Sequence, residues 1–184
     1  SVDTPLVEHA TMTLAALAGI NVATTGVLPL PPRHGMARHA LTIQRFDRMG
    51  GFRLHCLSAR TALRAAQLPE SYAALASVLL RLGHPDHQRA MREELFRRMV
   101  FNILMDNTDD HERNHSLVLG LDGYYALSPA YDVVPTLLNL GYQALSVGTA
   151  GAESSLENAL TQLNDFGIRK ARALELIRQV ARVV

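Results

Sequence analysis

The spacing of apolar positions changes along the chain, and the change divides it near residue 50. Apolar residues at helical spacing follow Asp3-Thr4-Pro5, which is typical of a helix cap with proline in the first turn, and predict a helix over about 5 to 18. Two β-favouring runs, 26 to 28 and 41 to 46, then flank a proline- and glycine-containing stretch. We therefore expect two strands of a small sheet joined by a turn at 29 to 35.

Beyond a polar, glycine-containing crossover at 47 to 53, the pattern becomes mainly helical. Helices are expected over 58 to 67, 71 to 82 and about 86 to 106. In the last of these, five apolar residues share one face: Met91, Leu95, Met99, Ile103 and Leu104. The charged residues between Arg89 and Arg98 are expected to form its solvated face.

A loop and a hairpin interrupt the helical part of the chain. Loop-forming residues at 107 to 110 precede two strand-like runs, 116 to 119 and 124 to 127, which the turn Asp122-Gly123 joins. Two further amphipathic helices are predicted, over 155 to 165 and 168 to 183.

Composition narrows the class of protein. The 184 residues are 48% apolar and 19% charged, which is ordinary for a globular chain. The formal charge of +1 is spread without a basic run, so we expect no direct nucleic-acid binding by this chain. No apolar run approaches the ~20 residues that cross a bilayer, and the N-terminus lacks a signal-peptide pattern, so a soluble, cytoplasmic protein is expected.

Three polar residues suggest phosphoryl-transfer chemistry. Asn114 follows Asp109 by five positions, and Asp132 lies eighteen positions further on, after the predicted hairpin. In protein kinases an Asp-x-x-x-x-Asn loop supplies the base for the substrate hydroxyl and a Mg²⁺ ligand, and a later aspartate supplies a second ligand. The spacing alone is weakly specific, because Asp and Asn are common in loops.

Longer motifs make the resemblance specific. The run 107 to 116, Asn-Thr-Asp-Asp-His-Glu-Arg-Asn-His-Ser, resembles the catalytic loop of HipA-like Ser/Thr kinases. The run 127 to 132, Leu-Ser-Pro-Ala-Tyr-Asp, resembles that family's magnesium segment at the family's spacing. Upstream, 44 to 48 is similar to its hinge strand, and 7 to 20 to the helix before it. The resemblance covers about 7 to 150 in consistent order.

This resemblance implies a role for each candidate residue. Asp109 would be the catalytic base, and Asn114 and Asp132 would bind Mg²⁺. Arg113 would neutralise phosphate charge, and His111 would orient the loop, since an imidazole can bond two backbone groups at once. The adenine of ATP would lie against the backbone of three consecutive residues, Gln44, Arg45 and Phe46.

The architecture implied is α+β and protein-kinase-like, of the HipA type. Residues 1 to 50 would be part of a small sheet-bearing N-lobe, and 51 to 184 a helical C-lobe with the catalytic hairpin. ATP and Mg²⁺ are the implied cofactors. The resemblance also implies a HipB-like DNA-binding antitoxin as partner, a toxin–antitoxin role, and a protein substrate of the aminoacyl-tRNA synthetase kind.

Two kinase features are absent from the sequence. It contains no G-x-G-x-x-G loop, and its only lysine, Lys170, lies near the C-terminus. In HipA-like relatives the lysine strand precedes the segment that matches Val7, so we interpret the chain as an incomplete kinase. Taken alone, it is expected to bind ATP poorly and to transfer phosphate at no useful rate.

Two other classes of function are compatible with parts of the sequence. His111, Glu112 and His115 form an H-E-x-x-H pattern, the zincin signature, which requires a continuous helix and a third ligand. The predicted loop and strand on either side leave little room for such a helix. The other alternative is a kinase-like lobe that acts as a non-catalytic binding module.

Overall fold

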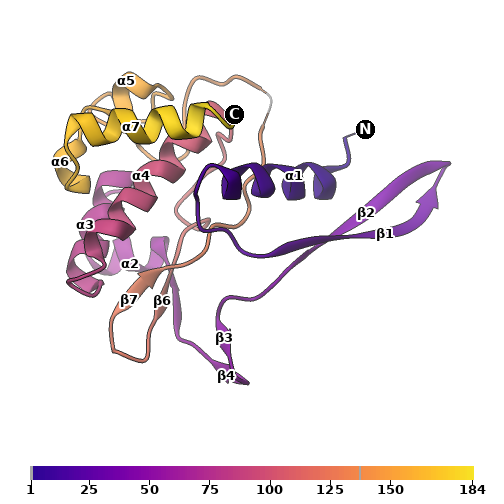
Figure 1. Cartoon of the computed structure of the whole chain (residues 1–184), viewed down its shortest axis with the longest axis horizontal. Helices are drawn as coiled ribbons and strands as arrows, with labels where there is room; N and C mark the ends of the chain where they lie inside the picture. The colour runs from indigo at the N-terminus through magenta and orange to yellow at the C-terminus, as the bar shows by residue number, and fades with distance from the viewer. Residues whose placement is uncertain (1, 137) are drawn as a thin grey trace.

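The computed structural model describes residues 2–136 and 138–184. Figure 1 shows a cluster of helices with α1 beside it, a long hairpin that projects away from the cluster, and a small hairpin at the lower end. The helices are α1 (Thr4–Leu17), α2 (Ala59–Ala65), α3 (Tyr72–Leu82), α4 (Gln88–Leu104), α5 (Leu156–Ala159), α6 (Leu163–Phe166) and α7 (Lys170–Ala181). The strands are β1 (Thr25–Arg33), β2 (Met36–Ile43), β3 (Arg48–Met49), β4 (Phe52–Arg53), β5 (Cys56–Ser58), β6 (Ser116–Leu119) and β7 (Tyr125–Leu127).

The N-terminal helix and hairpin follow the predicted order with different strand bounds. The predicted turn at 29 to 35 is wrong, because β1 continues through three prolines to Arg33 and turns at His34-Gly35. β1 and β2 form a two-stranded sheet of their own, so each has an edge where a residue without an N–H is tolerated. Both strands contact α1.

The crossover at 47 to 53 contains a second, very short hairpin. Arg48 pairs with Arg53 and Met49 with Phe52, so the two residues Gly50 and Gly51 make the turn. Both glycines have positive φ, 53° and 87°, as a two-residue turn with the twist of the strands requires. The hairpin is thus fixed by its turn sequence.

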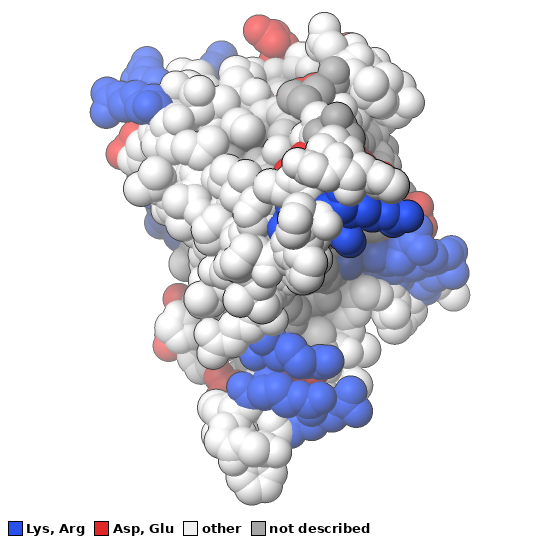
Figure 2. Space-filling view, turned by 90° about the vertical axis from the view of Figure 1, so that its right-hand side faces the viewer, with Lys and Arg blue, Asp and Glu red and all other residues white. Residues whose placement is uncertain are grey.

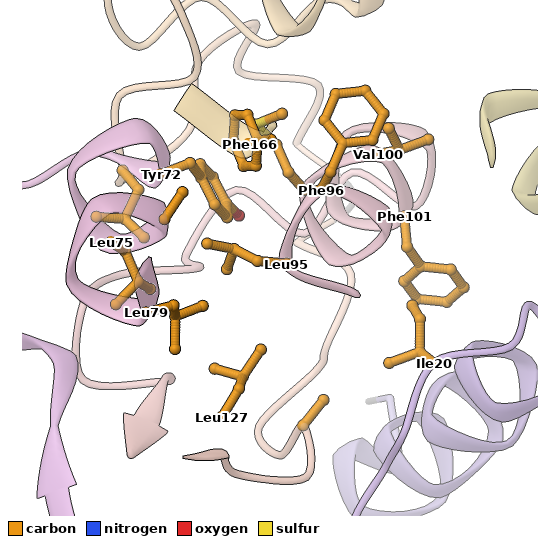
Figure 3. Close-up of a cluster of buried hydrophobic side chains, with 14 of the residues drawn as sticks. Ile20, Tyr72, Leu75, Leu79, Leu95, Phe96, Val100, Phe101, Leu127 and Phe166 are labelled. Carbon is orange, nitrogen blue, oxygen red and sulfur yellow. The ribbon is translucent and has the colours of Figure 1, made fainter. Parts of the chain in front are cut away.

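Helices α2, α3 and α4 begin and pack as their sequences favour. The hydroxyls of Ser58 and Ser71 accept hydrogen bonds from the backbone N–H three residues on and cap α2 and α3. Figure 3 shows the resulting core, in which Leu75 and Leu79 of α3 point toward Leu95 of α4. All three side chains are fully buried.

Helix α4 is buried on more sides than its apolar face predicts. Residues 98 to 102 are all buried, because α3 and α7 pack against the helix while the segments after α1 and β7 lie on it. The predicted solvated face is therefore wrong at Arg98, whose side chain is 3% exposed. Its charge is compensated by Glu94 one turn earlier, 3.0 Å from Nε.

The remaining elements frame the loop that carries the candidate chemistry. The predicted hairpin is confirmed as β6 and β7, and β5 extends it to a three-stranded antiparallel sheet in the order β5-β6-β7. The single helix predicted over 155 to 165 is two short helices, α5 and α6. Within the described residues, no helix is both long and apolar enough to cross a membrane.

Candidate active site

The loop from 107 to 116 is held to the end of α4 by polar contacts. Asn107 donates its backbone N–H to the carbonyl of Asn102 and its side-chain amide to the Asn102 side chain. The two consecutive aspartates that follow have opposite surroundings, since Asp109 is exposed and Asp110 is 4% exposed. Asp109 is therefore accessible to a substrate, whereas Asp110 is part of the interior.

Asp110 anchors the loop in the core. Its Oδ2 lies 2.8 Å from Nε2 of His115 and accepts a hydrogen bond from the hydroxyl of Tyr72, and Asn102 in turn donates to that hydroxyl. Burial opposes ionisation of Asp110, but His115, the hydrogen bonds and Arg98 outweigh it and lower the pKa of the carboxyl. Burial and the adjacent carboxylate raise the pKa of Tyr72, which keeps its hydroxyl as a donor.

Asn114 is turned back toward Asp109 by the same loop. Its backbone N–H donates to the carbonyl of His111, and its side-chain Nδ2 donates to the carbonyl of Asp109 at 3.3 Å. Among the described residues no donor reaches the Asn114 Oδ1, and this oxygen is not sealed from solvent. A hard oxygen in this position is a suitable ligand for Mg²⁺.

Tyr131 joins the segment before Asp132 to the loop around Asn114. Its hydroxyl donates to the carbonyl of Arg113 at 2.7 Å and lies 2.7 Å from Oγ of Ser116. The ring therefore fixes Asp132 beside the loop although eighteen residues separate Asp132 from Asn114. Asp132 is exposed and has φ of 57°, a left-handed conformation that is uncommon for residues other than glycine.

The segment from 44 to 46 meets the same tyrosine from another side. The ring of Phe46 stacks on that of Tyr131 with centroids 5.5 Å apart. Gln44 donates its backbone N–H to the carbonyl of Thr24, which joins this segment to the one before β1. Arg45 binds the Asp47 carboxylate through Nε and Nη2 and lowers the pKa of Asp47 to about 2.

One of the predicted site residues, His111, makes fewer contacts than the sequence suggested. The buried Nδ1 of His111 has no hydrogen-bond partner among the described residues, so the expectation that its imidazole bonds two backbone groups is wrong. Asp110 and His115 hold the loop instead. Arg113 is exposed, and among the described residues no hydrogen bond or ion pair is formed by its side chain, while its carbonyl accepts from Tyr131.

The H-E-x-x-H pattern lacks the geometry of a zincin site. Residues 111 to 115 form turns rather than a helix, and His115 is bound to Asp110. Glu112 is paired with Arg60 at 3.5 Å. Among residues 2–136 and 138–184, no three His, Cys, Asp or Glu side chains are grouped as metal ligands.

Glu8 is a candidate that the sequence did not single out. It lies on α1 and is half-buried, and both its burial and the negative charge of Asp132 raise the pKa of its carboxyl. The helix therefore places a second carboxyl within electrostatic range of the Asp132 segment. The available signal was the one acidic residue between Leu6 and Met12, a run in which His9 and Thr11 are the other polar residues.

Arg98 ties the segments on either side of the site together. Its Nη2 donates to the carbonyls of Asn21 and Ser128, and Glu94 accepts both from Arg98 and from the backbone N–H of Asn21. Burial lowers the pKa of the guanidinium, while Glu94 opposes that shift. Val22 also pairs with Ala130 in a short parallel bridge, so this group connects α1 to the segment before Asp132.

Comparison with known proteins identifies relatives over the whole chain. The family model described as the HipA-like C-terminal domain matches residues 2–184. A Haemophilus influenzae protein named "Putative kinase" is 27% identical over an alignment of 139 positions, which covers 69% of this chain and 40% of that protein. "Putative kinase Y4dM" of Sinorhizobium fredii is 28% identical over an alignment of 155 positions, which covers 71% of this chain and 34% of that protein. The chain thus spans well under half the length of these curated relatives.

Solved structures show the same fold. A Shewanella oneidensis MR-1 complex of HipA, HipB and operator DNA matches with a TM-score of 0.75 and 20% identity, over 97% of this chain and 47% of that chain. The Helicobacter pylori proinflammatory kinase CtkA matches with a TM-score of 0.62 and 10% identity, over 99% and 83%. The predicted kinase-like fold is confirmed by these matches.

Proposed function

The chain belongs to the family of HipA-like C-terminal domains, and on that premise we propose that it is the catalytic region of a Ser/Thr protein kinase. The reaction would be transfer of the γ-phosphate of ATP to a protein hydroxyl. The observation that carries the proposal is the meeting of three distant segments at Tyr131, which stacks on Phe46, binds the carbonyl of Arg113 and precedes Asp132. In a kinase, three such segments would serve the adenine, the substrate hydroxyl and the metal ion, which supports the proposal.

Each residue of the candidate site would have a separate role in the reaction. Asp109 is exposed and would accept the proton of the substrate hydroxyl as it attacks. The Oδ1 of Asn114 and the carboxylate of Asp132 would hold Mg²⁺, and the backbone at 44 to 46 would position adenine. Arg113 is exposed and unpaired among the described residues, so its guanidinium is available to a phosphate oxygen. ATP and Mg²⁺ would supply the phosphoryl group and the neutralising charge.

The backbone at Asp132 supports a functional role for this residue. A left-handed aspartate is strained by roughly 1 kcal/mol or more, and such residues gather at sites where the surrounding structure fixes them. Here the preceding Tyr131 is held by Ser116 and Phe46, while the following Val133 is buried. The strained conformation of Asp132 is thus held by the residues on both sides of it.

We further propose a HipB-like antitoxin as a partner of the whole protein. The support is the Shewanella HipA structure, which contains HipB and operator DNA. Because this chain corresponds to about half of that HipA chain, the proposal concerns the full-length protein.

The test uses three substitutions of exposed aspartates in the full-length protein. Asp109→Asn and Asp132→Asn are each expected to reduce phosphoryl transfer to protein by at least about a hundredfold, since each removes a group that acts on the transition state. Asp122→Asn, in the exposed turn between β6 and β7, is the matched control and should retain full activity. Transfer would be followed with radiolabelled ATP, and thermal unfolding would confirm that all three variants fold. Wild-type rates in Asp109→Asn would refute the assignment of the base.

A further inference from the structure

The positive charge of this chain is concentrated in one segment. Residues 33 to 64 contain seven arginines and a single acidic residue, Asp47, a formal charge of +6 in a chain whose total is +1. Elsewhere three arginines of α4 and α7 are matched by carboxylates, in the pairs Arg89–Glu93, Arg98–Glu94 and Arg172–Glu175. The near-neutral total therefore conceals a strong asymmetry.

Most arginines of this segment lack a carboxylate partner. Arg45 is paired with Asp47, and Arg60 with Glu112. Among the described residues no ion pair or hydrogen bond is formed by the side chains of the other five, which are all exposed: Arg33, Arg38, Arg48, Arg53 and Arg64. Figure 2 shows basic side chains gathered at the lower end of the molecule above an uncharged tip. That end is the β3–β4 hairpin, because the view is turned about the vertical axis of Figure 1.

The small hairpin has a basic face and an apolar face. Arg48 is paired across the strands with Arg53, and Met49 with Phe52, so each pair shares a face and the two faces are opposite. Phe52 is 76% exposed and Met49 is 45% exposed. On the basic side, a hollow of about 430 Å³ is lined by Arg53, His55, Cys56, Leu54 and Asp47.

The hairpin is attached directly to the candidate site. It begins two residues after Phe46, whose ring stacks on Tyr131, and the N–H of Leu54 donates to the carbonyl of Asp47 to close its base. Two strand residues span about 7 Å, so the arginine pair lies roughly 15 Å or less from the segment that ends at Asp132. A polypeptide bound at the site would reach the hairpin within about five extended residues.

We propose that the β3–β4 hairpin is a docking element for an acidic segment of the protein that receives the phosphate, with carboxylates at Arg48 and Arg53 and an apolar side chain at Met49 and Phe52. This rests on the proposed kinase function. A protein fits the surface better than a nucleic acid, because Phe46, the other phenylalanine of the segment, is already stacked on Tyr131 and is not available to stack on a base.

Binding is measured without ATP, so that it is independent of catalysis. The probes are a fluorescent serine peptide flanked by Glu and Leu, the same peptide with Gln in place of each Glu, and an RNA and a DNA oligonucleotide of equal length. Wild-type protein, both this chain and the full-length form, should bind the Glu peptide most tightly in fluorescence anisotropy. Arg48→Ala/Arg53→Ala should weaken that binding about tenfold, as expected for two exposed ion pairs.

Two further variants test whether a loss of binding is specific to the arginines of the hairpin. Arg178→Ala/Arg182→Ala removes the same charge from exposed positions at the end of α7, away from the hairpin, and should change binding less than about twofold. Met49→Ala/Phe52→Ala should weaken the binding of the Glu peptide and of the Gln peptide by the same factor, because this variant loses only an uncharged contact. Equal losses in both arginine variants, or no loss in Arg48→Ala/Arg53→Ala, would overturn the proposal. Tighter binding of an oligonucleotide than of the Glu peptide would overturn it as well.

The two proposals fail separately. Peptide binding that depends on Arg48 and Arg53, together with an absence of transfer by the full-length wild type, would contradict the kinase function and leave the docking surface in place. Transfer that depends on Asp109, with peptide binding indifferent to the two arginines, would contradict only the docking surface.

Discussion

Two adjacent aspartates should respond in opposite ways to the same substitution. Asp110→Asn replaces a buried carboxylate that binds His115 and Tyr72, whereas Asp109→Asn changes an exposed one. Hydrogen bonds to a charged group contribute about 1.5–3 kcal/mol each, and an asparagine retains one acceptor oxygen, so we expect Asp110→Asn to cost about 3 kcal/mol. Asp109→Asn should cost less than about 0.5 kcal/mol, as is usual for exposed positions.

The pH dependence follows from the lowered pKa of Asp110. A carboxyl whose pKa is lower in the folded state stabilises the fold fully above its unfolded pKa of about 3.9, and this contribution is lost as pH falls through the folded value. The difference in unfolding free energy between wild type and Asp110→Asn should therefore be largest at neutral pH and shrink below about pH 4.

The assay is urea unfolding of this chain at several pH values, with thermal scans as a second measure. For a chain of this size, 3 kcal/mol corresponds to a fall in Tm of about 6–12 °C. The reasoning would be refuted if Asp110→Asn cost less than about 1 kcal/mol at pH 7, or if Asp109→Asn destabilised the protein equally. Unchanged urea m-values would show that the comparison is between similar folded and unfolded states.

Three further predictions concern the site's surroundings. Arg98→Met should lower the free energy of unfolding by about 3–5 kcal/mol in urea, because it removes the ion-pair partner of Glu94 and the donor to the carbonyls of Asn21 and Ser128; adding Glu94→Leu should recover part of the loss. The free energy of unfolding of Glu8→Gln should equal that of wild type at pH 4 and exceed it by less than about 1 kcal/mol at pH 7. The reason is that the raised pKa of Glu8 means that the stabilising contribution of its carboxyl is lost as pH rises. An equal gain in an Asp132→Asn background would contradict the coupling between the two carboxyls. Calorimetric titration of this chain with ATP and Mg²⁺ should show no micromolar binding, since its only lysine is Lys170 at the start of α7; micromolar affinity with turnover would refute this.

The sequence predicted the helices and strands better than it predicted the residues that they contact. Periodicity located α1, α3 and the β6–β7 hairpin, because local spacing determines them, although the cap expected at Asp3 is wrong: its side chain lies 2.6 Å from His39 and makes no capping hydrogen bond. The division of 155 to 165 into two helices depends on long-range polar contacts. The Asn158 side chain binds the backbone of Ala150 and Gly151, and such bonds compete with helix continuation.

At the candidate site, residue types could be predicted but their partners could not. Asp109 and Asp110 are identical in type, and only the positions of Tyr72 and His115 in space determine which one is buried. Arg98 looked solvated because its neighbours on α4 are charged, and its burial depends on the segments that contain Asn21 and Ser128. Glu8 could not be connected with Asp132 because the two lie far apart in the chain.

The anchoring of the loop by Asp110 has a consequence for local opening. Because Tyr72 and Asn102 belong to the core helices, the amides from 107 to 116 cannot exchange with solvent by a small fluctuation of the loop alone. Those that are hydrogen-bonded should exchange hydrogen for deuterium only as often as the whole helical domain unfolds. The β3–β4 hairpin has two ladder pairs and no core, so its amides should exchange orders of magnitude faster. The proposed docking hairpin and the proposed catalytic loop thus belong to cooperative units of very different stability.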